Sequence, residues 1–483
     1  MRTASLGLGI LGLLLPAGCS CRRGCAPEPA VSQAPHVDGV ERDLAPEAPG
    51  PLAAVLPVPR HASTVGDLLC INEAVSVPER FVRRREVDAI TIAAMLEDDA
   101  RLARSVGAAT VRANSANYPY LSWHEWQAKS RAQDRTDRYL ALVQQAGIDP
   151  IVVIGPWPGN QTANYTERYV PDDLEAYAAW VQRVVERYDG DGVDDAPGLL
   201  RPVLFWEVDN EPDLHNSVVP RNAKREVDPA SFETPEQYAR VLVATSAAIH
   251  AAQPDAVVLN GGTFHTGRDG GRRYLERVLA QPGAAAAVDA LSIHAYFEER
   301  TPELFLAALD NAEGLAAGRP VFITETGVPS SRKGSSWLDE SFQARMLVFV
   351  YGEALARGIE RVCWHTLADP PSGPASSGGF ASHSLHRTVG EGRAQAREPK
   401  LSGVVFQRLS EQVGDVPLSE LRPVALAEGR AVRLGGVGWL VYDGQDVVLP
   451  LDAGVVVDLI SGTEAPYTGV VSAPALVRPA TEE

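Results

Sequence analysis

Two glutamates each follow a short apolar run of the kind that forms a buried strand. Glu211 comes after the run at 203–206, and Glu325 comes after the run at 321–323. Two carboxyl groups that face each other across a sugar can break a glycosidic bond, because one protonates the leaving oxygen while the other attacks or stabilises the anomeric carbon. The pair therefore predicts hydrolysis of a glycosidic bond, with Glu211 and Glu325 as the catalytic residues.

Each glutamate taken alone has a plainer interpretation. Glu211 lies in Asn210-Glu211-Pro212, and a proline after a glutamate commonly begins a helix or a turn. A glutamate that ends a barrel strand, as Glu325 would, is often a salt-bridge partner at the rim. Their occurrence in two corresponding positions of one repeating pattern favours the catalytic interpretation.

The elements that would position these residues are eight short apolar runs, which alternate with longer segments of helical periodicity. The runs are 68–72, 109–112, 151–154, 203–206, 257–259, 291–293, 321–323 and 361–364. The expected helices are 90–106, 134–146, 174–188, 235–252, 274–279, 302–317 and 399–413. This alternation is typical of parallel β/α units. Eight units, with no glycine-rich dinucleotide loop after the first, favour a closed (β/α)8 TIM barrel over an open doubly wound sheet.

The barrel is expected to span residues 61–416, with its active site at the carboxyl ends of the strands. Beyond it, glycine-rich turns and short alternating runs at 439–442, 447–449 and 455–459 predict a small antiparallel β-domain. We expect this domain, residues 417–483, to be a β-sandwich-like appendage. Its only candidate aromatic platforms for a sugar are Trp439, Tyr442 and Tyr467.

The first residues resemble a bacterial lipoprotein signal peptide, residues 1–18. Arg2 precedes an apolar run from Leu6 to Leu15 that is too short for a stable membrane span, and small residues lead to Cys19. The resemblance implies a lipidated Cys19 that holds the protein on the cell envelope, in the outer membrane by its sorting residue Ser20. An ordinary cleaved secretory signal is the alternative. The proline-rich residues 19–60 are expected to act as a tether.

Charge and cysteine content limit the partners and the compartment. The net charge is −18, from 62 acidic and 44 basic residues, which makes nucleic acid a poor partner. We expect a monomer. Cys70 and Cys363 are the cysteines of the predicted barrel, in its first and eighth strands. These strands are neighbours in a closed barrel, so a disulfide is one hypothesis and two buried free thiols are the other.

Four motifs together match a known family. They are Asn210-Glu211-Pro212 after the fourth run, His294-Ala295-Tyr296 after the sixth, Thr324-Glu325-Thr326-Gly327 after the seventh, and Trp364 on the eighth. They resemble glycoside hydrolase clan A, the retaining barrel enzymes that include cellulase-like and xylosidase-like families. The resemblance spans residues 65–415 and implies a carbohydrate substrate, with β-glycosides or arabinofuranosides as the class.

The resemblance also implies roles for individual residues. Glu211 would be the acid/base and Glu325 the nucleophile, while Asn210 would hold the 2-hydroxyl of the sugar. Arg112 matches an arginine that orients the nucleophile, and Tyr296 would hydrogen-bond the nucleophile. Trp364 would form the floor of a sugar subsite. His294 and Trp157 are the remaining candidate substrate-binding residues. His294 could instead be a satisfied buried histidine, and Trp157 stands where many cellulase-like members carry histidine.

These roles require two different pKa values. Glu211 must be protonated to act as an acid, so its pKa should be raised by partial burial and by the charge of Glu325. Glu325 must stay ionised, which Arg112 and a hydrogen bond from Tyr296 would favour. The reaction needs no metal and no cofactor.

Three alternatives concern other functions and a metal. The chain could be a glycan-binding surface lipoprotein without activity, although both glutamates are present, or a transglycosylase with the same catalytic residues. Asp189, Asp191 and Asp194 could hold a structural Ca²⁺, but their loop lacks the closing glutamate of a calcium loop, so a solvated acidic loop is the other interpretation.

Overall fold

The computed structural model describes residues 60–72, 89–113, 120–123, 126, 132–156, 170–171, 173–213, 234–264, 266–297, 301–331, 338–369, 382–390 and 396–480. The predicted signal peptide, the tether up to residue 59, and with them Cys19, lie outside the described residues, as does Trp157. The described residues belong to one compact unit.

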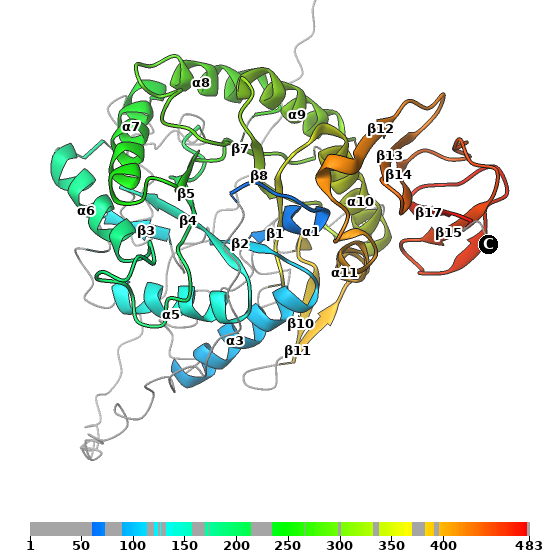
Figure 1. Ribbon diagram of the computed structural model, residues 1–483, viewed down its shortest axis with the longest axis horizontal. Coiled ribbons are helices and arrows are strands. Elements are labelled where there is room, and N and C mark those ends of the chain that lie inside the picture. Colours follow the sequence, from blue (N-terminus) through cyan, green and yellow to red (C-terminus); the bar gives the residue numbers. More distant parts are fainter. Residues whose placement is uncertain are drawn as a thin grey trace, which may run out of the picture. The chain divides into compact units, whose positions relative to one another are not determined.

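Eight parallel strands form a nearly closed ring surrounded by helices (Figure 1). Around the ring the order is β6-β5-β4-β2-β1-β9-β8-β7. The strands are β1 (Leu69–Asn72), β2 (Thr110–Ala113), β4 (Asp149–Gly155), β5 (Phe205–Val208), β6 (Val257–Asn260), β7 (Leu291–His294), β8 (Val321–Thr326) and β9 (Arg361–His365). Between β6 and β7 the ring continues through two single bridges, Leu259 with Ala290 and Thr263 with Ile293. The predicted TIM barrel is confirmed, and every predicted run contributes a strand.

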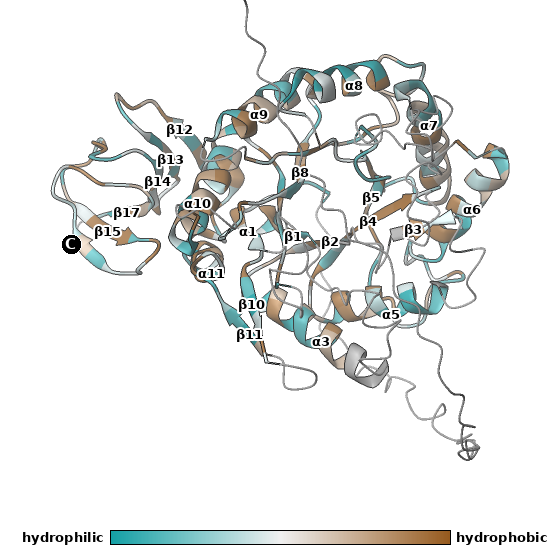
Figure 2. Cartoon of the chain, turned by 180° about the vertical axis from the view of Figure 1, so that it is seen from behind, coloured by the Kyte–Doolittle hydropathy of each residue, from teal (hydrophilic) through white to brown (hydrophobic). Residues whose placement is uncertain are grey.

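Most of the helices follow strands and lie on the outside of the ring (Figure 1), whereas the first helix precedes β1. They are α1 (Val65–Leu68), α3 (Ala89–Ser105), α5 (Ala132–Gln145), α6 (Leu174–Glu186), α7 (Pro235–Ala252), α8 (Asp269–Leu279), α9 (Glu303–Ala316), α10 (Glu340–Arg357) and α11 (Leu401–Val413). Figure 2 shows a strongly hydrophobic β4, while helices such as α7 and α8 carry both hydrophobic and hydrophilic residues. This two-sided colouring is expected for helices that pack one face on the barrel.

Local sequence signals explain several helix ends. Thr234 begins α7 with a reciprocal capping box, in which its side chain accepts from the backbone of Gln237 and the Gln237 side chain accepts from the Thr234 backbone. Pro235 occupies the first turn, where a missing N–H costs nothing. Asp339 caps α10 at its amino end, and Gly358 ends it in the left-handed conformation.

The interior of the barrel is apolar at the amino ends of its strands. The rings of Phe205 and Phe322 lie 5.8 Å apart, and the guanidinium of Arg361 covers the Phe205 ring at 5.2 Å. In the same layer Cys70 on β1 lies directly opposite Cys363 on β9, and the two form a disulfide. The disulfide hypothesis is therefore confirmed, and the alternative of two free thiols is wrong.

The chain after the barrel forms one six-stranded antiparallel sheet with the order β12-β13-β14-β17-β15-β16. Its strands are β12 (Leu421–Val424), β13 (Arg430–Leu434), β14 (Gly438–Asp443), β15 (Gly454–Asp458), β16 (Glu464–Pro466) and β17 (Ala475–Pro479). The predicted strand at 447–449 is wrong, because Val447 makes only a single bridge with Val471. Val447 and Leu449 instead pack, together with Tyr467 and Val471, on one face of the sheet.

The other face of this sheet packs on α10. Tyr442 contacts Phe349 edge to face at 6.1 Å, and a Cβ added to Gly352 would lie 2.2 Å from the Tyr442 ring. Tyr442, Trp439 and Tyr467 are all buried, so none of these three candidate platforms presents a face to a sugar. Among the described helices, none combines the length and the apolar character that a membrane crossing requires.

Candidate active site

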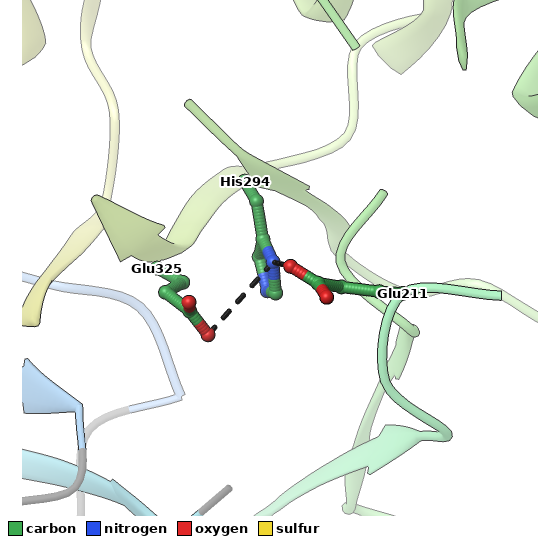
Figure 3. A group of neighbouring side chains, drawn as sticks. All are labelled: Glu211, His294 and Glu325. Atoms are coloured by element: carbon green, nitrogen blue, oxygen red, sulfur yellow. Dashed lines mark hydrogen bonds and ion pairs between the residues drawn. The ribbon is translucent and has the colours of Figure 1, made fainter. Parts of the chain in front are cut away.

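Glu211 and Glu325 meet at the carboxyl ends of the barrel strands. Glu325 lies in β8, and Glu211 lies three residues beyond the end of β5, in a left-handed backbone conformation with φ of 48°. An oxygen of each carboxyl group and a ring nitrogen of His294 all lie within 4.8 Å of one another (Figure 3). The two predicted catalytic residues are thus side by side, although 114 positions separate 211 from 325 in the sequence.

His294, at the end of β7, stands between the two carboxyl groups. Its Nδ1 lies 2.8 Å from Oε1 of Glu211 and 3.9 Å from Oε2 of Glu325. The ring is fully buried, and its Nε2 has no hydrogen-bond partner among the described residues. Burial lowers the pKa of His294, but the charges of Glu325 and Glu211 outweigh it and the pKa is raised.

Gly262 makes room for this histidine. A Cβ at that position would lie 2.3 Å from the Cδ2 and Nε2 atoms of His294, closer than carbon atoms approach. The carbonyl of Gly262 also accepts a hydrogen bond from the backbone N–H of Glu211 at 3.1 Å. One glycine therefore positions both the histidine and the glutamate that it contacts.

Glu325 is held in its ionised form. The hydroxyl of Tyr296 donates to its Oε1, and Nη1 of Arg112 lies 3.4 Å from its Oε2. Burial alone raises the pKa of this carboxyl group. The charges of His294 and Arg112 and the bond from Tyr296 nevertheless hold the pKa of Glu325 at about 2.

Glu211 shows the opposite shift. Burial is the main cause that raises its pKa, and the negative charges of Glu325 and Asp213 add to it. The hydrogen bond and charge of His294 act in the other direction but are smaller in sum, so the pKa of Glu211 is raised. Facing carboxyl groups, one kept protonated and one kept ionised, are suited to acid and nucleophile roles.

Arg112, on β2, connects four residues of the site. Its guanidinium donates to Glu207, to Oδ1 of Asn72 at 3.2 Å and to Oδ1 of Asn210 at 2.8 Å, in addition to Glu325. Arg112 and Glu207 are both fully buried. The structure therefore brings the predicted Arg112 and Asn210 to the two glutamates.

Glu207, on β5, was not identified from the sequence. Its Oε1 accepts from the hydroxyl of Ser292 at 2.9 Å, from that of Thr324 at 3.0 Å and from the backbone N–H of Gly262 at 2.9 Å, while Oε2 accepts from Arg112. Charge inside an otherwise apolar strand was the available signal, because a buried carboxylate requires partners.

His365 and Asn72 are two further residues that sequence reasoning missed. Arg112 can only donate, so its contact fixes Oδ1 of Asn72 on the Arg112 side. The amide Nδ2 of Asn72 then donates to Nδ1 of His365 at 3.0 Å. Burial lowers the pKa of His365, which agrees with a neutral ring whose proton is on Nε2. No sequence motif marked these residues, since their contacts depend on the pairing of β1 with β9.

Aromatic residues complete the surroundings of Glu325. Trp364, on β9, is fully buried and donates from Nε1 to the carbonyl of His383 at 2.9 Å. Tyr296 packs 6.0 Å from the ring of Phe264. Phe297 stacks instead on Phe305 at 5.0 Å, so it belongs to the core.

Within the part of the chain that the structure describes, two groups of residues have the composition of a metal site. Glu211, His294 and Glu325 form one, but the Arg112 guanidinium at Glu325 places a positive charge where a cation would have to bind. Glu186, Asp189 and Asp191 form the other, without the predicted Asp194. Burial and neighbouring carboxylates raise the pKa of Asp189 to about 6. Calcium binding there stays a prediction.

Comparisons with known proteins give independent information about the fold of the chain. No family model matches the chain, and no curated protein matches it. A glucosidase from Croceicoccus marinus has a TM-score of 0.51 at 14% identity, with 87% of this chain and 83% of that chain covered. An exo-β-1,4-mannosidase from Opitutaceae bacterium strain TAV5 has a TM-score of 0.49 at 19% identity, with 71% of this chain and 59% of that chain covered. A β-xylosidase from Caulobacter crescentus has a TM-score of 0.47 at 18% identity, covering 77% and 78%. At 14% identity, the likeness to the glucosidase supports the TIM barrel fold and nothing beyond the fold.

Proposed function

We propose that the protein is a retaining glycoside hydrolase, which cleaves O-glycosidic bonds of a polysaccharide or oligosaccharide by double displacement. The observation that carries this proposal is the pair Glu211 and Glu325, whose nearest oxygens lie within 4.8 Å and whose pKa values are shifted in opposite directions. Carboxyl groups about 5 to 5.5 Å apart are typical of retaining enzymes, whereas inverting enzymes separate them by about 6.5 to 9.5 Å to admit a water.

In the first step, the protonated carboxyl group of Glu211 gives its proton to the glycosidic oxygen. Glu325 attacks the anomeric carbon as the bond to that oxygen breaks, so the leaving sugar departs as an alcohol. The product is an ester between the glycone and Glu325. Glu325 is buried and the side chain of Glu211 is only 14% exposed, which limits the access of competing water during this step.

In the second step, Glu211 is ionised and acts as a base. It takes a proton from a water molecule, and the oxygen of that water attacks the anomeric carbon and releases Glu325 as a carboxylate. Glu211 now carries the proton taken from that water and Glu325 is a free carboxylate, so both residues have regained their starting states. Two inversions at one carbon give net retention.

Neighbouring residues would hold the sugar and the nucleophile. Arg112 and Tyr296 orient Glu325 through their hydrogen bonds. Arg112 also fixes Oδ1 of Asn210, which sets the orientation of the Asn210 amide, and we assign to that amide the 2-hydroxyl of the sugar. Trp157 is proposed to border a sugar subsite, whereas Trp364 is fully buried and would form a subsite floor only if the residues that cover it moved aside. The substrate class proposed is a β-glycoside or an arabinofuranoside, and no metal takes part.

The full-length protein would be incubated with 2-deoxy-2-fluoro glycosides that carry activated leaving groups, covering several glycones. Intact mass and peptide mapping should find a covalent adduct on Glu325, because the fluorine slows both steps whereas the activated leaving group speeds only the first, so the ester accumulates. Glu325→Gln is the matched control and should form no adduct. Product analysis with a natural glycan separates hydrolysis from transglycosylation.

The opposite outcome would be no adduct from any glycone, with wild type and Glu325→Gln equally inert on natural polysaccharides. That result would reject the hydrolase and favour a glycan-binding role.

We also propose that Cys19 carries lipid and anchors the protein at the cell envelope. The support is the leader composition, with Arg2 and the apolar run before Cys19. Expression in a bacterial host followed by mass measurement of the mature amino terminus would test the anchor. A terminus at Cys19 with added acyl mass is expected, and a soluble periplasmic product without lipid would refute it.

A further inference from the structure

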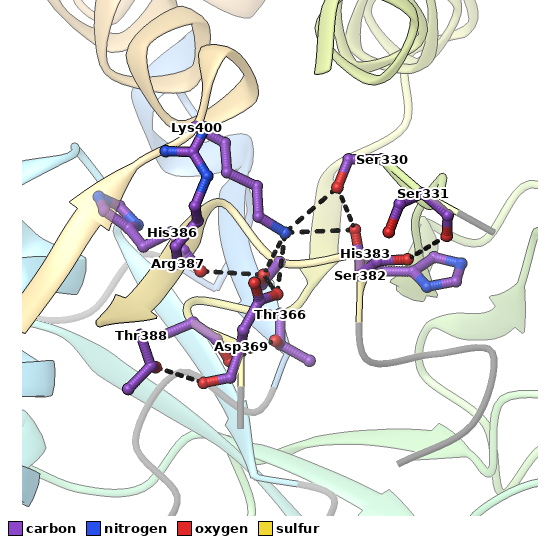
Figure 4. Close-up of polar contacts among 12 residues, drawn as sticks. Ser330, Ser331, Thr366, Asp369, Ser382, His383, His386, Arg387, Thr388 and Lys400 are labelled. Atoms are coloured by element: carbon purple, nitrogen blue, oxygen red, sulfur yellow. Dashed lines mark hydrogen bonds and ion pairs between the residues drawn. The ribbon is translucent and has the colours of Figure 1, made fainter. Parts of the chain in front are cut away.

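A second group of buried polar side chains lies behind the proposed site. We call it the Lys400 cluster and define it as the buried Lys400, Asp369, Ser384 and Ser382 together with the partly exposed Ser330 (Figure 4). The side chain of Lys400 is 3% exposed and that of Asp369 is 7% exposed. Buried lysines and aspartates are rare in proteins unless they are paired, so this cluster needs an explanation.

Lys400 Nζ connects all the other members. It donates to Oδ1 of Asp369 at 2.8 Å, to Oγ of Ser384 at 2.9 Å and to the carbonyl of Ser382 at 3.3 Å. It also lies 3.4 Å from Oγ of Ser330. The hydroxyl of Ser384 donates to Asp369 in turn. Ser384 is almost fully buried and its proton is committed to Asp369, so a separate nucleophilic role for this serine does not fit.

The cluster joins segments that follow β8, which carries Glu325, and its neighbour β9. Ser330 comes four residues after β8, and Asp369 comes four residues after β9. The backbone N–H and the hydroxyl of Ser330 both donate to the Ser382 carbonyl, at 2.9 and 3.0 Å. Lys400 itself immediately precedes α11. One ammonium group thus fixes the spacing of three separate segments.

His383 lies between Ser382 and Ser384, at the point where this fixed segment reaches the proposed site. Its carbonyl accepts the Nε1–H of Trp364 at 2.9 Å. Its ring packs at right angles to Tyr296, with centroids 6.1 Å apart, and 6.1 Å from the ring of His365. Tyr296 donates to Glu325, and Asn72 connects His365 to Arg112, which also contacts Glu325.

Gly327 provides the space for this arrangement. A Cβ there would lie 2.9 Å from the carbonyl oxygen of His365 and 3.2 Å from Cδ2 of His383. The glycine of the Thr324-Glu325-Thr326-Gly327 motif thus lets the His383 ring lie close behind the nucleophile strand. His383 is therefore packed against both the strand that carries Glu325 and the residues that touch Glu325.

The attraction within a buried ion pair often does not exceed the free-energy cost of removing both charges from water, and apolar residues of the same size are often at least as stabilising. A lysine with four oxygen neighbours in three segments fixes geometry in a way that apolar packing does not. We propose that Lys400 is a positioning residue for the site, which holds Ser382–Ser384 in place and so fixes His383 against Trp364 and Tyr296. The proposal rests on the proposed hydrolase function for its kinetic part.

The test compares Lys400→Met, Asp369→Asn and the double variant in the full-length protein. Lys400→Met leaves the Asp369 carboxylate buried and unpaired, so a marked fall in melting temperature is expected. The double variant removes both charges and should regain most of that loss, but Met and Asn cannot rebuild the bonds to Ser382 and Ser384. The double variant therefore separates the effect of Lys400 on stability from its effect on the position of Ser382–Ser384.

The kinetic readout is kcat/KM for whichever 4-nitrophenyl glycoside is cleaved. In the double variant it should stay roughly tenfold to hundredfold below wild type, because small displacements of site residues have effects of that size. Arg201→Met is the matched control, since Arg201 is a poorly exposed cation that contacts Asp149 and the carbonyls of Gln144 and Ile148. That pair lies at the amino end of β4, so its loss should lower the melting temperature and leave kcat/KM unchanged.

A spectroscopic readout works without activity. In protein labelled with ¹⁵N-tryptophan, the indole N–H signal of Trp364, assigned by its absence in Trp364→Phe, reports the bond to His383. It should shift in the Lys400→Met and double variants while the indole signal of Trp206, which bonds Val203, stays in place. If the protein proves inert on every glycoside, this shift alone still supports the positioning role. An unchanged Trp364 signal together with wild-type kcat/KM in the double variant would overturn it.

Discussion

Arg112 contacts two carboxylates, only one of which is proposed to change its charge during the reaction. Glu207 takes no part in the proposed reaction and accepts hydrogen bonds from Ser292, Thr324 and Gly262 as well as from Arg112, whereas Glu325 would lose its charge when it forms an ester. Without Glu207, the buried guanidinium would be paired with a carboxylate in one state and unpaired in the next. Glu207 therefore keeps the charge of Arg112 balanced throughout the cycle.

Replacing Glu207 should test this balance. Glu207→Gln keeps the shape but removes the counter-charge of a fully buried arginine, so we expect the free energy of unfolding to fall by about 3 to 5 kcal/mol. Urea denaturation followed by circular dichroism measures it. Glu353→Gln is a comparison outside the site, where a buried glutamate pairs with Arg357 and Arg430 near the surface. An equal or smaller loss for Glu207→Gln than for Glu353→Gln would contradict the expectation.

The opposite pKa shifts of the two glutamates predict opposite effects on stability. The pKa of Glu325 falls to about 2 in the folded protein from an ordinary 4.5, so its stabilising contribution is present above pH 4.5 and is lost as pH falls through 2. The raised pKa of Glu211 has the reverse effect, because its stabilising contribution is lost as pH rises through the folded value. At pH 7, Glu325→Gln should lower the free energy of unfolding, by about 3 kcal/mol from the size of the shift. Glu211→Gln should raise it.

Denaturation of both variants beside wild type at pH 7 decides the matter. The prediction fails if the two substitutions change stability in the same direction.

The same shifts set the pH dependence of activity. Turnover requires Glu325 ionised and Glu211 protonated, so kcat/KM should be bell-shaped, with its acid limb near the low pKa of Glu325 and its basic limb above the ordinary glutamate value. Tyr296→Phe removes one cause of the low pKa and should move the acid limb to higher pH. Initial rates across a pH series on an aryl glycoside measure both limbs. A basic limb at or below pH 4.5 would contradict the raised pKa of Glu211.

Sequence reasoning found the residues that lie in motifs and missed those defined by packing. Glu211, Asn210 and Glu325 follow strand-like runs, and the barrel fold then places strand ends together. His383 could not be found in this way, because its place depends on a lysine that is 17 positions away in the sequence. Asn72 and His365 were missed for the same reason, because they come into contact only when the first and last barrel strands pair.

At the scale of elements, α10 shows why one helix was not recognised. Its residues are buried without interruption from Leu347 to Leu355, since the barrel covers one side and the carboxyl-terminal sheet covers another. A helix covered on several sides has no polar face, and therefore lacks the periodicity by which helices are identified. In contrast, α7 begins and ends where the sequence predicts, because its capping box at Thr234 and Gln237 is visible in the residues themselves.

The contact between α10 and the sheet depends on Gly352. Gly352→Ala would drive a methyl group into the ring of Tyr442, so we expect separation of the sheet from the helix and a loss of about 1 to 3 kcal/mol of stability. Gly314→Ala on α9 is the matched control. A Cβ at Gly314 meets no atom within 4 Å, so the better helix propensity of alanine should raise stability by about 0.5 to 1 kcal/mol. Thermal unfolding of both variants compares them, and a stabilised Gly352→Ala protein would refute the packing argument.

At the scale of the whole molecule, the disulfide joins the first barrel strand to the last. Cys70 and Cys363 lie 293 positions apart, so the bond closes a very long loop and restricts the unfolded chain. Replacing both with alanine should lower the free energy of unfolding by about 2 to 5 kcal/mol. Denaturation of the Cys70→Ala/Cys363→Ala variant beside wild type, with and without a reducing agent, measures the effect.

Peptide mapping under non-reducing conditions provides the control for this prediction. Wild type should yield one peptide pair linked through Cys70 and Cys363. Two unlinked peptides with free thiols, and a reducing agent without effect on wild-type stability, would show that the bond does not form.

The bond also changes what a protease can do to the molecule. A single backbone nick anywhere between Cys70 and Cys363 leaves both pieces covalently joined, so a nicked barrel can stay assembled and its Glu211 and Glu325 halves cannot diffuse apart. A nick beyond Cys363 has no such protection, and α11 and the carboxyl-terminal sheet would then be held by packing alone. Tolerance of a single backbone cut would thus be a property of the barrel and not of the carboxyl-terminal sheet.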